Sequence, residues 1–460
     1  MSISEETHQA AARPAPGIPL SLQQEFLCAM DKGDEEGSFG TKHIIASAWR
    51  LSGPVDTGTL QRALDDVVER HEMLRTSIVR DEDEPSQLVH PPSPVQLLIR
   101  ELSGEDPDTR DRVAEEFFNE VESGTYRVSE LPHVRAALGR FDEDDAVLVL
   151  VVHHVACDGW SMRVIMRDLT LRYAALRGHS GTDLPEWRQY REYVSWQQGK
   201  PSDPATRRSL DYWREQLRDA SIAAVTADRP RSAGLPSVYS THRFMIDAEV
   251  TSGVLKLARA MRCSPFMVLI AVYNVIMHRE AGVDDVVVST FTSGRDHEGF
   301  HDSVGAFLNF VPLRSDVGAC RTFAELLERT RATCIDALTH DVPFVLIEGE
   351  APELMAPFME DDLDVIAFEV LQFPEALDGQ FIGDVKYTEM RRRLLSQPVS
   401  SDIPDGALWA LDILPSGEMI GSLKYNSSRF EASTMWRLIE DYDQVLRNAV
   451  GDPNIPLSEI

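Results

Sequence analysis

The sequence lacks the features that mark membrane-spanning, secreted and nucleic-acid-binding proteins. Its apolar runs are all shorter than the roughly 20 residues that a membrane-spanning helix needs. The opening segment, MSISEETHQAAARPAPGIPLS, is polar and has no apolar signal core. Basic residues are scarce, because 45 lysines and arginines face 75 aspartates and glutamates, which leaves a net charge of −30. Such a charge repels nucleic acid and anionic membranes, so we expect neither as a partner. The lack of a signal core in the opening segment favours a cytoplasmic protein.

Cysteine is also scarce, and its spacing excludes two common site types. The odd count of five and the absence of any CxxC pair argue against a disulfide framework and against a zinc site. We therefore expect reduced thiols and no bound metal. No glycine-rich phosphate loop follows an expected strand, and we expect the chain to bind no cofactor of its own. The cysteines are Cys28, Cys157, Cys263, Cys320 and Cys334.

The length and the local patterns predict a mixed α/β fold in two parts. A chain of 460 residues exceeds what one core needs, and no repeat at periods of 20–50 residues is visible. Apolar periodicity predicts a helix over 59–74, a buried strand over 146–152, and a helix capped by Ser161 and ended by Gly178. The polar stretch that follows is the best internal boundary. We expect a disordered lead (1–17), a first subdomain (18–178), a linker (179–188) and a second subdomain (189–460).

The second half repeats the same mixture of helices and strands. Two helices are expected on either side of a break near Cys263–Pro265, and DDVVVSTFTSGRD is expected to be a strand that enters a glycine turn. The last strand and helix are expected in GSLKYNSSRF and STMWRLIEDYDQVLRNAV. The densest basic cluster, Arg391 to Arg393, is either a contact for an acidic partner or, more commonly for such runs, a solvated helix face.

The segment VLVLVVHHVACDGWSM, residues 147–162, carries the clearest chemical signal. Consecutive strand residues point to opposite faces, so His153 and His154 cannot both face one cleft. One should be a chemical group and the other structural, and periodicity does not say which. Asp158-Gly159 is a turn signal, and Asp158 can cap that turn or pair with an arginine.

Three interpretations of the histidines compete. They can be satisfied packing residues, metal ligands, or a general base with its neighbour. The opposed faces and the lack of HExxH spacing disfavour a metal. No GxSxG elbow is present, and Cys157 is best interpreted as an inert buried thiol. If the protein supplies no nucleophile, the substrate must, which points to direct acyl transfer onto an incoming hydroxyl or amine.

Several segments together resemble one family. HHVACDGWS resembles the HHxxxDG motif of the condensation domains of nonribosomal peptide synthetases. Further segments match that family's motifs in order, from about residue 18 to the end of the chain. They are LSLQQEFL, RHEMLRT, YREYVSWQ, DYWREQL, VGAFLNFVPLR and HDVPFVLIE. The stretch DDLDVIAFEVLQF barely matches the family's seventh motif, which leaves acceptor or partner specificity open.

The resemblance implies a fold and a set of site residues. The fold would be two chloramphenicol-acetyltransferase-like halves in a V, with a tunnel between them. The catalytic residues would be His154 as base or positioning group, its neighbour His153, and Gly159, which lets the backbone approach the thioester. Asp158 would be structural, paired with Arg70, Arg75 or Arg295, and we do not choose between these from the sequence. Residues expected to line the tunnel or pack near it are Trp160, Ser161 and Asn309.

The resemblance also implies the partners. Because no adenylation or carrier-protein motif is present, we expect a free-standing enzyme. It would take an aminoacyl group from the phosphopantetheine arm of a separate carrier protein and transfer it to a small soluble alcohol or amine. The sequence looks most similar to members of enediyne antibiotic pathways, which form esters, and the DxxxxD pattern of the cyclising relatives is absent. The alternatives are an epimerase, which would need a glutamate across the tunnel, and a non-catalytic carrier-docking protein.

Overall fold

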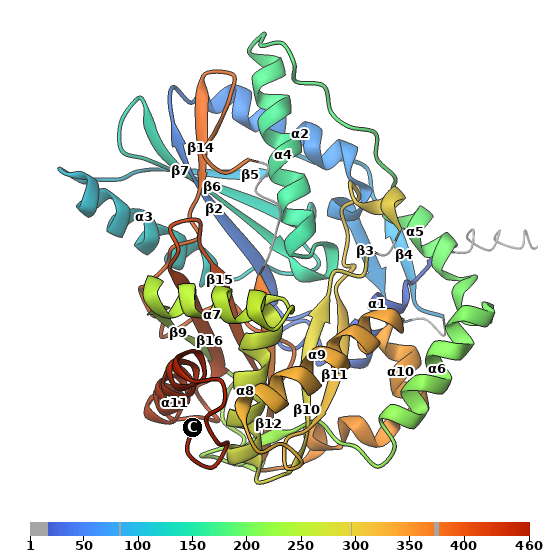
Figure 1. The fold of residues 1–460 in the computed structure, drawn as a ribbon. Coiled ribbons are helices and arrows are strands. Elements are labelled where there is room, and N and C mark those ends of the chain that lie inside the picture. Colours follow the sequence, from blue (N-terminus) through green and yellow to red (C-terminus); the bar gives the residue numbers. More distant parts are fainter. Residues whose placement is uncertain (1–16, 82–83, 296, 372–376) are drawn as a thin grey trace, which may run out of the picture.

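Two layered halves of helix and sheet make up the protein, which we describe from a computed structural model. In Figure 1 the first half, blue to green, lies above the second, yellow to red. The structure describes residues 17–81, 84–295, 297–371 and 377–460. The lead expected to be disordered, 1–17, falls outside this range except for its last residue.

The first half is organised around a six-stranded sheet of order β13-β14-β2-β7-β6-β5. The predicted strand over 146–152 is confirmed as β7 (Asp145–His153), which pairs antiparallel with β2 (Ile44–Ser52) and β6 (Val134–Arg140). Its side chains are apolar on both faces because both faces are covered. One face packs against α3 (Pro107–Glu122), and the other packs against α2 (Thr57–Arg70) and α4 (Gly159–Leu176). The edge strand β5 (Gln96–Glu101) runs parallel to β6.

Helix α4 starts three residues earlier than the sequence suggested. Its N-cap is Asp158, whose carboxylate accepts the backbone N–H of Ser161 at 2.7 Å, so the expected cap at Ser161 is wrong. Both residue types cap well, and glycine is tolerated in the first turn, so composition alone did not separate them. The helix ends before Gly178, which has a φ of +86° and provides the left-handed turn that was expected there.

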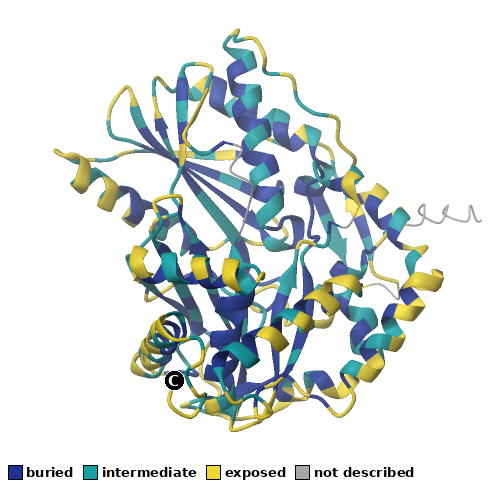
Figure 2. Cartoon of the chain, in the orientation of Figure 1, coloured by how far each residue is buried: buried dark blue, intermediate teal, exposed yellow. Residues whose placement is uncertain are grey.

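The second half is built on a five-stranded sheet of order β8-β12-β15-β16-β9. Its strands are β8 (Ala224–Thr226), β9 (Tyr239–Ile246), β12 (Leu363–Leu371), β15 (Ala407–Ile413) and β16 (Met419–Asn426). Its core surrounds α8 (Pro265–Ala281), in which every residue from Met267 to Met277 is buried. Figure 2 shows that the central elements of the molecule are buried (dark blue), whereas the outer faces of its helices are exposed (yellow). The remaining elements here are α7 (Ala248–Ala260), α9 (Phe323–Thr339), α11 (Ala432–Gly451), β10 (Asp285–Thr292) and β11 (Asn309–Asp316).

Several elements near the N-terminus and after the linker pack along the side of the molecule. Helix α1 (Leu22–Ala29) contacts α10 (Phe344–Glu350), where the rings of Phe26 and Phe344 lie 5.1 Å apart. The small sheet of β1 (Ile18–Pro19), β4 (Ser86–Val89) and β3 (Thr76–Val79) lies on the same side of Figure 1. The expected linker, 179–188, has no helix or strand and leads into α5 (Tyr190–Gln197) and α6 (Pro204–Gln216).

A strand pair from late in the chain crosses back into the first half. β13 (Gln380–Ile382) and β14 (Val385–Glu389) extend the six-stranded sheet, with Glu389 opposite Trp49 of β2. In Figure 1 the orange β14 lies among the blue strands of that sheet. The range 189–460, expected to form the second half, therefore contributes strands to both halves.

The basic cluster that follows β14 is not a solvated helix face. Residues 390–396 form no helix, and two of the three arginines reach acids in different halves. Arg391 binds Asp412 of β15 at 2.7 Å, and Arg393 binds Glu122 of α3 at 2.6 Å. Both arginine side chains are about nine-tenths buried, so they connect elements of the protein and are not available to an acidic partner.

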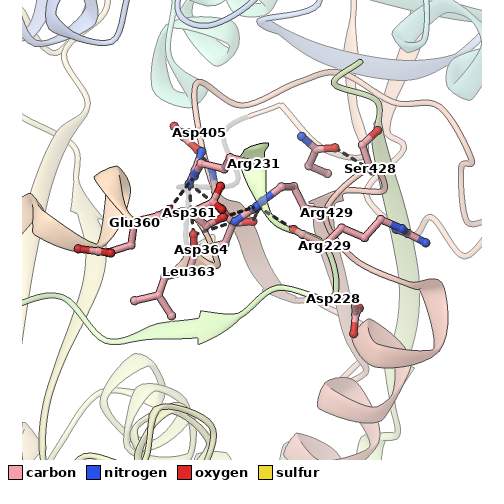
Figure 3. A network of polar contacts seen from close by, with 12 residues as sticks. Asp228, Arg229, Arg231, Glu360, Asp361, Leu363, Asp364, Asp405, Ser428 and Arg429 are labelled. Carbon is pink, nitrogen blue, oxygen red and sulfur yellow. Dashed lines mark hydrogen bonds and ion pairs between the residues drawn. The ribbon is translucent and has the colours of Figure 1, made fainter. Parts of the chain in front are cut away.

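A second ionic network closes one end of the second half and reaches the first (Figure 3). Asp364 lies between Arg429 at 2.9 Å and Arg231 at 2.6 Å. Arg231 also binds Asp405 at 2.9 Å, and Asp405 accepts Lys32 from the first half at 2.8 Å. Because Asp364 and Arg429 are nearly inaccessible, this network fixes the strand ends that it joins.

All five cysteines are free, as expected for reduced thiols. Within the described ranges, no single helix is long and apolar enough to span a membrane. Helices α7 and α8 reach that length together, but they meet at 107° at the break predicted near Cys263–Pro265.

Candidate active site

The histidine motif occupies the turn between β7 and α4. His153 is the last residue of β7, and its ring is 2% exposed, with Nε2 3.1 Å from the carbonyl of Gly40. Burial, reinforced by the nearby His133, lowers the pKa of His153 to about 3. A neutral, enclosed imidazole bound to the backbone is a structural group, so His153 does not reach a substrate.

His154 leaves the strand and is accessible. It opens the 3-10 turn His154–Ala156, is partly exposed, and stacks on the ring of His43 at 4.9 Å with an interplanar angle of 9°. Its backbone N–H donates to the carbonyl of His43 at 2.9 Å, which fixes the stack. Burial lowers the pKa of His154, and the nearby charge of Lys424 acts in the same direction. The ring is therefore neutral at pH 7, which is the state a general base requires.

Sequence reasoning missed two further histidines of this cluster. His43 precedes β2 and donates through Nδ1–H to the carbonyl of Ser38 (2.7 Å). Burial and the two motif histidines lower its pKa. His133 precedes β6, lies beside His153, and has its pKa lowered to about 4 by burial. Only the pairing of β2 and β6 with β7 brings them to the motif, and neither has a signal in its own neighbours in the sequence.

Asp158 joins the two halves beneath His154. Arg295 of the second half lies 3.1 Å from its carboxylate, and the side chains are 3% and 1% exposed. The second oxygen of Asp158 accepts the backbone N–H of Phe307 at 3.0 Å. The Arg295 guanidinium also donates to the carbonyls of Phe300 and Ser303, at 2.8 and 2.9 Å, and lies over the ring of Phe307. Of the three expected arginine partners, Arg295 is the one in contact.

The other two arginines have different partners. Arg70 binds Asp168 of α4 at 2.8 Å, and Arg75 donates to the backbone carbonyl of Val68 at 3.3 Å and to that of His90. Their assignment to Asp158 is wrong. Both stabilise the packing of α2 and the turn after it, at a distance from the motif.

Two of the residues expected to line the tunnel or pack near it are buried. Ser161 is 0% exposed, and its hydroxyl contacts the guanidinium of Arg295 at 2.7 Å and the carbonyl of Gly305 at 2.9 Å. Asn309 is 4% exposed. Its amide nitrogen donates to the carboxylate of Asp341 and the carbonyl of Val342, both at 2.8 Å, and its amide oxygen accepts the backbone N–H of Phe344 at 2.9 Å. Neither polar group is free to line a tunnel, because each is bonded to buried neighbours; that the two residues pack near the tunnel stays a prediction. Trp160 is partly exposed and donates its indole N–H to the carbonyl of His301 at 2.8 Å.

The first turn of α4 provides backbone donors next to His154. Gly159 and Trp160 are its first two residues, and neither backbone N–H has an acceptor within the part of the chain that the structure describes. Unpaired amides at a helix N-terminus favour negative charge. The turn thus combines a neutral base with groups able to stabilise an oxyanion.

The second half contributes two charged groups on the sheet face that looks toward the histidines. Lys424 of β16 is partly exposed, and its charge acts on His154, His43 and Glu369. Glu369 of β12 stands in the same row as Ala410 and Ser422 across the sheet. Burial raises the pKa of Glu369 to about 7, against the opposing effect of Lys424. Neither residue was identified from the sequence.

Other reactive groups near the motif do not assemble a second centre. Cys157 is buried with Sγ 3.3 Å from the carbonyl of Asp158, and burial raises the pKa of its thiol well above the usual range. It is therefore not a nucleophile at pH 7. Within the described ranges, no group of three or more histidine, cysteine or acidic side chains has metal-binding geometry.

Comparison with known proteins identifies what this arrangement is similar to. The model of the condensation-domain family matches residues 18–460. The chain is 29% identical to chondramide synthase cmdD of Chondromyces crocatus over 98% of its length and 28% identical to the phosphinothricin tripeptide synthetase PhsC of Streptomyces viridochromogenes over all of it. It spans 11% and 42% of those relatives, less than half of either.

Solved structures agree on the fold. The SgcC5 protein of Streptomyces globisporus, crystallised with (R)-(−)-1-(2-naphthyl)-1,2-ethanediol and sucrose, is 45% identical, with a TM-score of 0.92 over 95% of this chain and all of that one. The first condensation domain of the calcium-dependent antibiotic synthetase, at 20% identity, has a TM-score of 0.77 over 97% of this chain and 99% of its own. The predicted chloramphenicol-acetyltransferase-like fold in two halves is confirmed.

Proposed function

The chain belongs to the condensation-domain family, and we propose that it transfers an aminoacyl group from a carrier-protein thioester to a small soluble acceptor. The observation that carries this proposal is His154, a neutral and partly exposed imidazole beside the two unpaired amides of Gly159 and Trp160. The described residues offer a base and oxyanion donors there but no activated nucleophile. The nucleophile must then come from the acceptor.

The residues would act as follows. His154 takes the proton of the acceptor hydroxyl as its oxygen attacks the thioester carbonyl, and the amides of Gly159 and Trp160 stabilise the resulting oxyanion. The intermediate collapses as the C–S bond breaks, and the imidazolium returns its proton to the departing pantetheine thiolate. The imidazole is then neutral again, and the product is an ester and a free carrier thiol. The phosphopantetheine arm belongs to the carrier and is not bound permanently by this chain.

We favour a hydroxyl over an amine acceptor. The 45% identical SgcC5 protein was crystallised with a naphthyl ethanediol, which is an alcohol. The sequence also resembles the ester-forming members of enediyne antibiotic pathways. A neutral imidazole suits this task, because an alcohol keeps its proton at pH 7 and needs a base as it attacks.

The test is a transfer assay with both acceptor types. The protein is mixed with aminoacyl groups loaded on a phosphopantetheinylated carrier, and with the naphthyl ethanediol or its amino-alcohol counterpart. Mass spectrometry then detects an ester or an amide. We expect an ester and a fall of about 10²- to 10⁴-fold in kcat for His154→Ala. His278→Ala, which removes a histidine at the far end of α8, should keep full activity. A His154→Ala variant with wild-type turnover would refute the proposal.

Epimerisation is a second candidate because of Glu369. That reaction needs an acid–base group opposite the histidine, and Glu369 has a pKa near neutrality on the facing sheet. The same assay without an acceptor separates the two activities. Inversion of the carrier-bound aminoacyl group, abolished by Glu369→Gln, would indicate an epimerase, whereas an unchanged configuration together with ester formation would indicate transfer.

A further inference from the structure

A cavity of about 190 Å³ lies between the two sheets, away from the turn that carries the histidine motif. Small side chains create it. Ala46 and Ala48 of β2 form one wall, and Ala410, Gly421 and Ser422 of β15 and β16 form the other. Its volume is that of a small organic group, well above the space that one water molecule fills.

The cavity lies further along strand β2 from the histidine stack. His43, stacked on His154, immediately precedes β2, and Ala46 and Ala48 follow it by three and five residues. At about 3.3 Å per strand residue, the cavity begins about 10 Å from the histidine stack. The facing strand β16 connects the same two places in the opposite direction, because Ser422 lines the cavity and Lys424, two residues further along, acts on His154. One extended molecule can therefore reach from His154 into the cavity.

The lining is charged, and one cation in it is poorly compensated. Arg163 and Arg391 have their own carboxylates, Glu389 at 2.8 Å and Asp412 at 2.7 Å. Arg243 differs. It donates to the amide oxygen of Gln397 at 2.6 Å and lies 3.5 Å from Glu122, a carboxylate already bound by Arg393 and near Lys424.

The environment of Arg243 makes an anion favourable beside it. Its side chain is 9% exposed, and its buried Nε has no hydrogen-bond partner within the described residues. Burial and the adjacent Arg393 lower the pKa of Arg243 to about 9. A guanidinium in this position gains from an added oxygen acceptor, and a carboxylate offers two.

We propose that this cavity is a subsite for the far end of a substrate whose reacting atom lies at His154, and that Arg243 selects a far end that carries a carboxylate over an apolar one. The inference rests on the proposed function for the position of the reacting atom. The carboxylate can belong to the acyl group or to the acceptor, and the test separates the two sources.

Binding measurements with matched pairs of ligands test the proposal without requiring turnover. Suberyl-pantetheine and octanoyl-pantetheine have the same chain length and differ in a terminal carboxylate or methyl group. The pair 8-hydroxyoctanoate and 1-octanol represents the acceptor. Isothermal titration should give at least about tenfold tighter binding of the carboxylate member in one of the two pairs. That pair identifies the source of the carboxylate.

Variants connect the preference to the cavity. Arg243→Met should reduce the preference to within about twofold, and Arg243→Lys should keep part of it. Arg392→Met removes an exposed arginine of the neighbouring segment and should leave the preference unchanged. Ser422→Leu fills the cavity from its other wall and should weaken binding of the preferred ligand, which covers the case in which Arg243→Met does not fold.

The outcomes separate this inference from the proposed function. Equal binding of both members of both pairs by the wild-type protein, or unchanged binding by Ser422→Leu, would overturn the subsite. A carboxylate preference that depends on Arg243 would support the subsite even if no acyl transfer were detected. Acyl transfer without any preference would remove the subsite and leave the transfer proposal intact.

Discussion

Replacing Asp158 by alanine should destabilise the protein strongly, and this consequence follows directly from the contacts of one carboxylate. Asp158 receives the guanidinium of Arg295 and the backbone N–H groups of Ser161 and Phe307. In Asp158→Ala all three donors lose their acceptor, and the Arg295 charge stays in a site where its side chain is 1% exposed.

The magnitude can be estimated from this burial. Removing one member of a buried ion pair costs about 3–5 kcal/mol, because the remaining charge is desolvated and unpaired. For a chain of 460 residues that unfolds as one unit, the unfolding entropy makes each kcal/mol worth about 1 °C of melting temperature. The expected decrease in Tm is therefore about 3–5 °C. The double variant Asp158→Ala/Arg295→Met should be more stable than the sum of the single changes implies, since it leaves no uncompensated charge.

Thermal unfolding, followed by fluorescence and circular dichroism, measures this effect. The matched control is Asp66→Ala, which removes an aspartate paired with Arg172 on the surface, where the side chains are 33% and 41% exposed. Such a pair contributes at most about 1 kcal/mol. Asp158→Ala could instead have the same Tm as the wild type and the control and lose only acyl transfer. In that case the structural role of Asp158 is wrong, and the carboxylate acts on the substrate.

Three further predictions concern charge. The folded-state pKa values of His133 and His153, about 4 and about 3, lie below the unfolded value of about 6.5, so the unfolded state binds more protons below pH 6.5. Stability measured by denaturant unfolding should therefore fall from pH 6.5 toward pH 4, by up to about 1.4 kcal/mol per pH unit for each histidine. Because the pKa of His154 is lowered, the acid limb of kcat/KM in the transfer assay should have its midpoint below pH 6.5. Glu122→Gln leaves Arg393 without its carboxylate, and calorimetry should show a Tm several degrees lower than that of the wild type.

The elements that local sequence determines were predicted well. The strand over 146–152 and the break near Cys263–Pro265 follow from side-chain period and from proline, which act over a few residues. The start of α4 was misplaced by three residues because Asp158 and Ser161 are both good caps. Only the burial of the Ser161 hydroxyl against Gly305, 144 residues away, distinguishes them.

The arginine cluster shows where local pattern fails. When only the adjacent residues are considered, a run of three arginines indicates a solvent-exposed helix face. The acids that bury two of them come from α3, about 270 positions earlier, and from β15, about 20 positions later. The crossover of β14 into the first sheet brings these segments together, and no periodicity encodes that crossover.

The candidate site also has a part that the local sequence predicts and a part that depends on strands distant in sequence. The second part bears on substrate choice. The HHxxxDG segment alone specified a base and a turn, because both lie within a few residues of each other. The groups that set the environment of that base, His43 and Lys424, come from strands paired or packed against it. The cavity that lies beyond them depends on Arg243 and Ser422 of the second half. Two chains with the same motif can therefore share the chemistry we propose for His154 and still admit different substrates. Substitutions that exchange substrates should accordingly fall on the facing sheet and leave the motif unchanged.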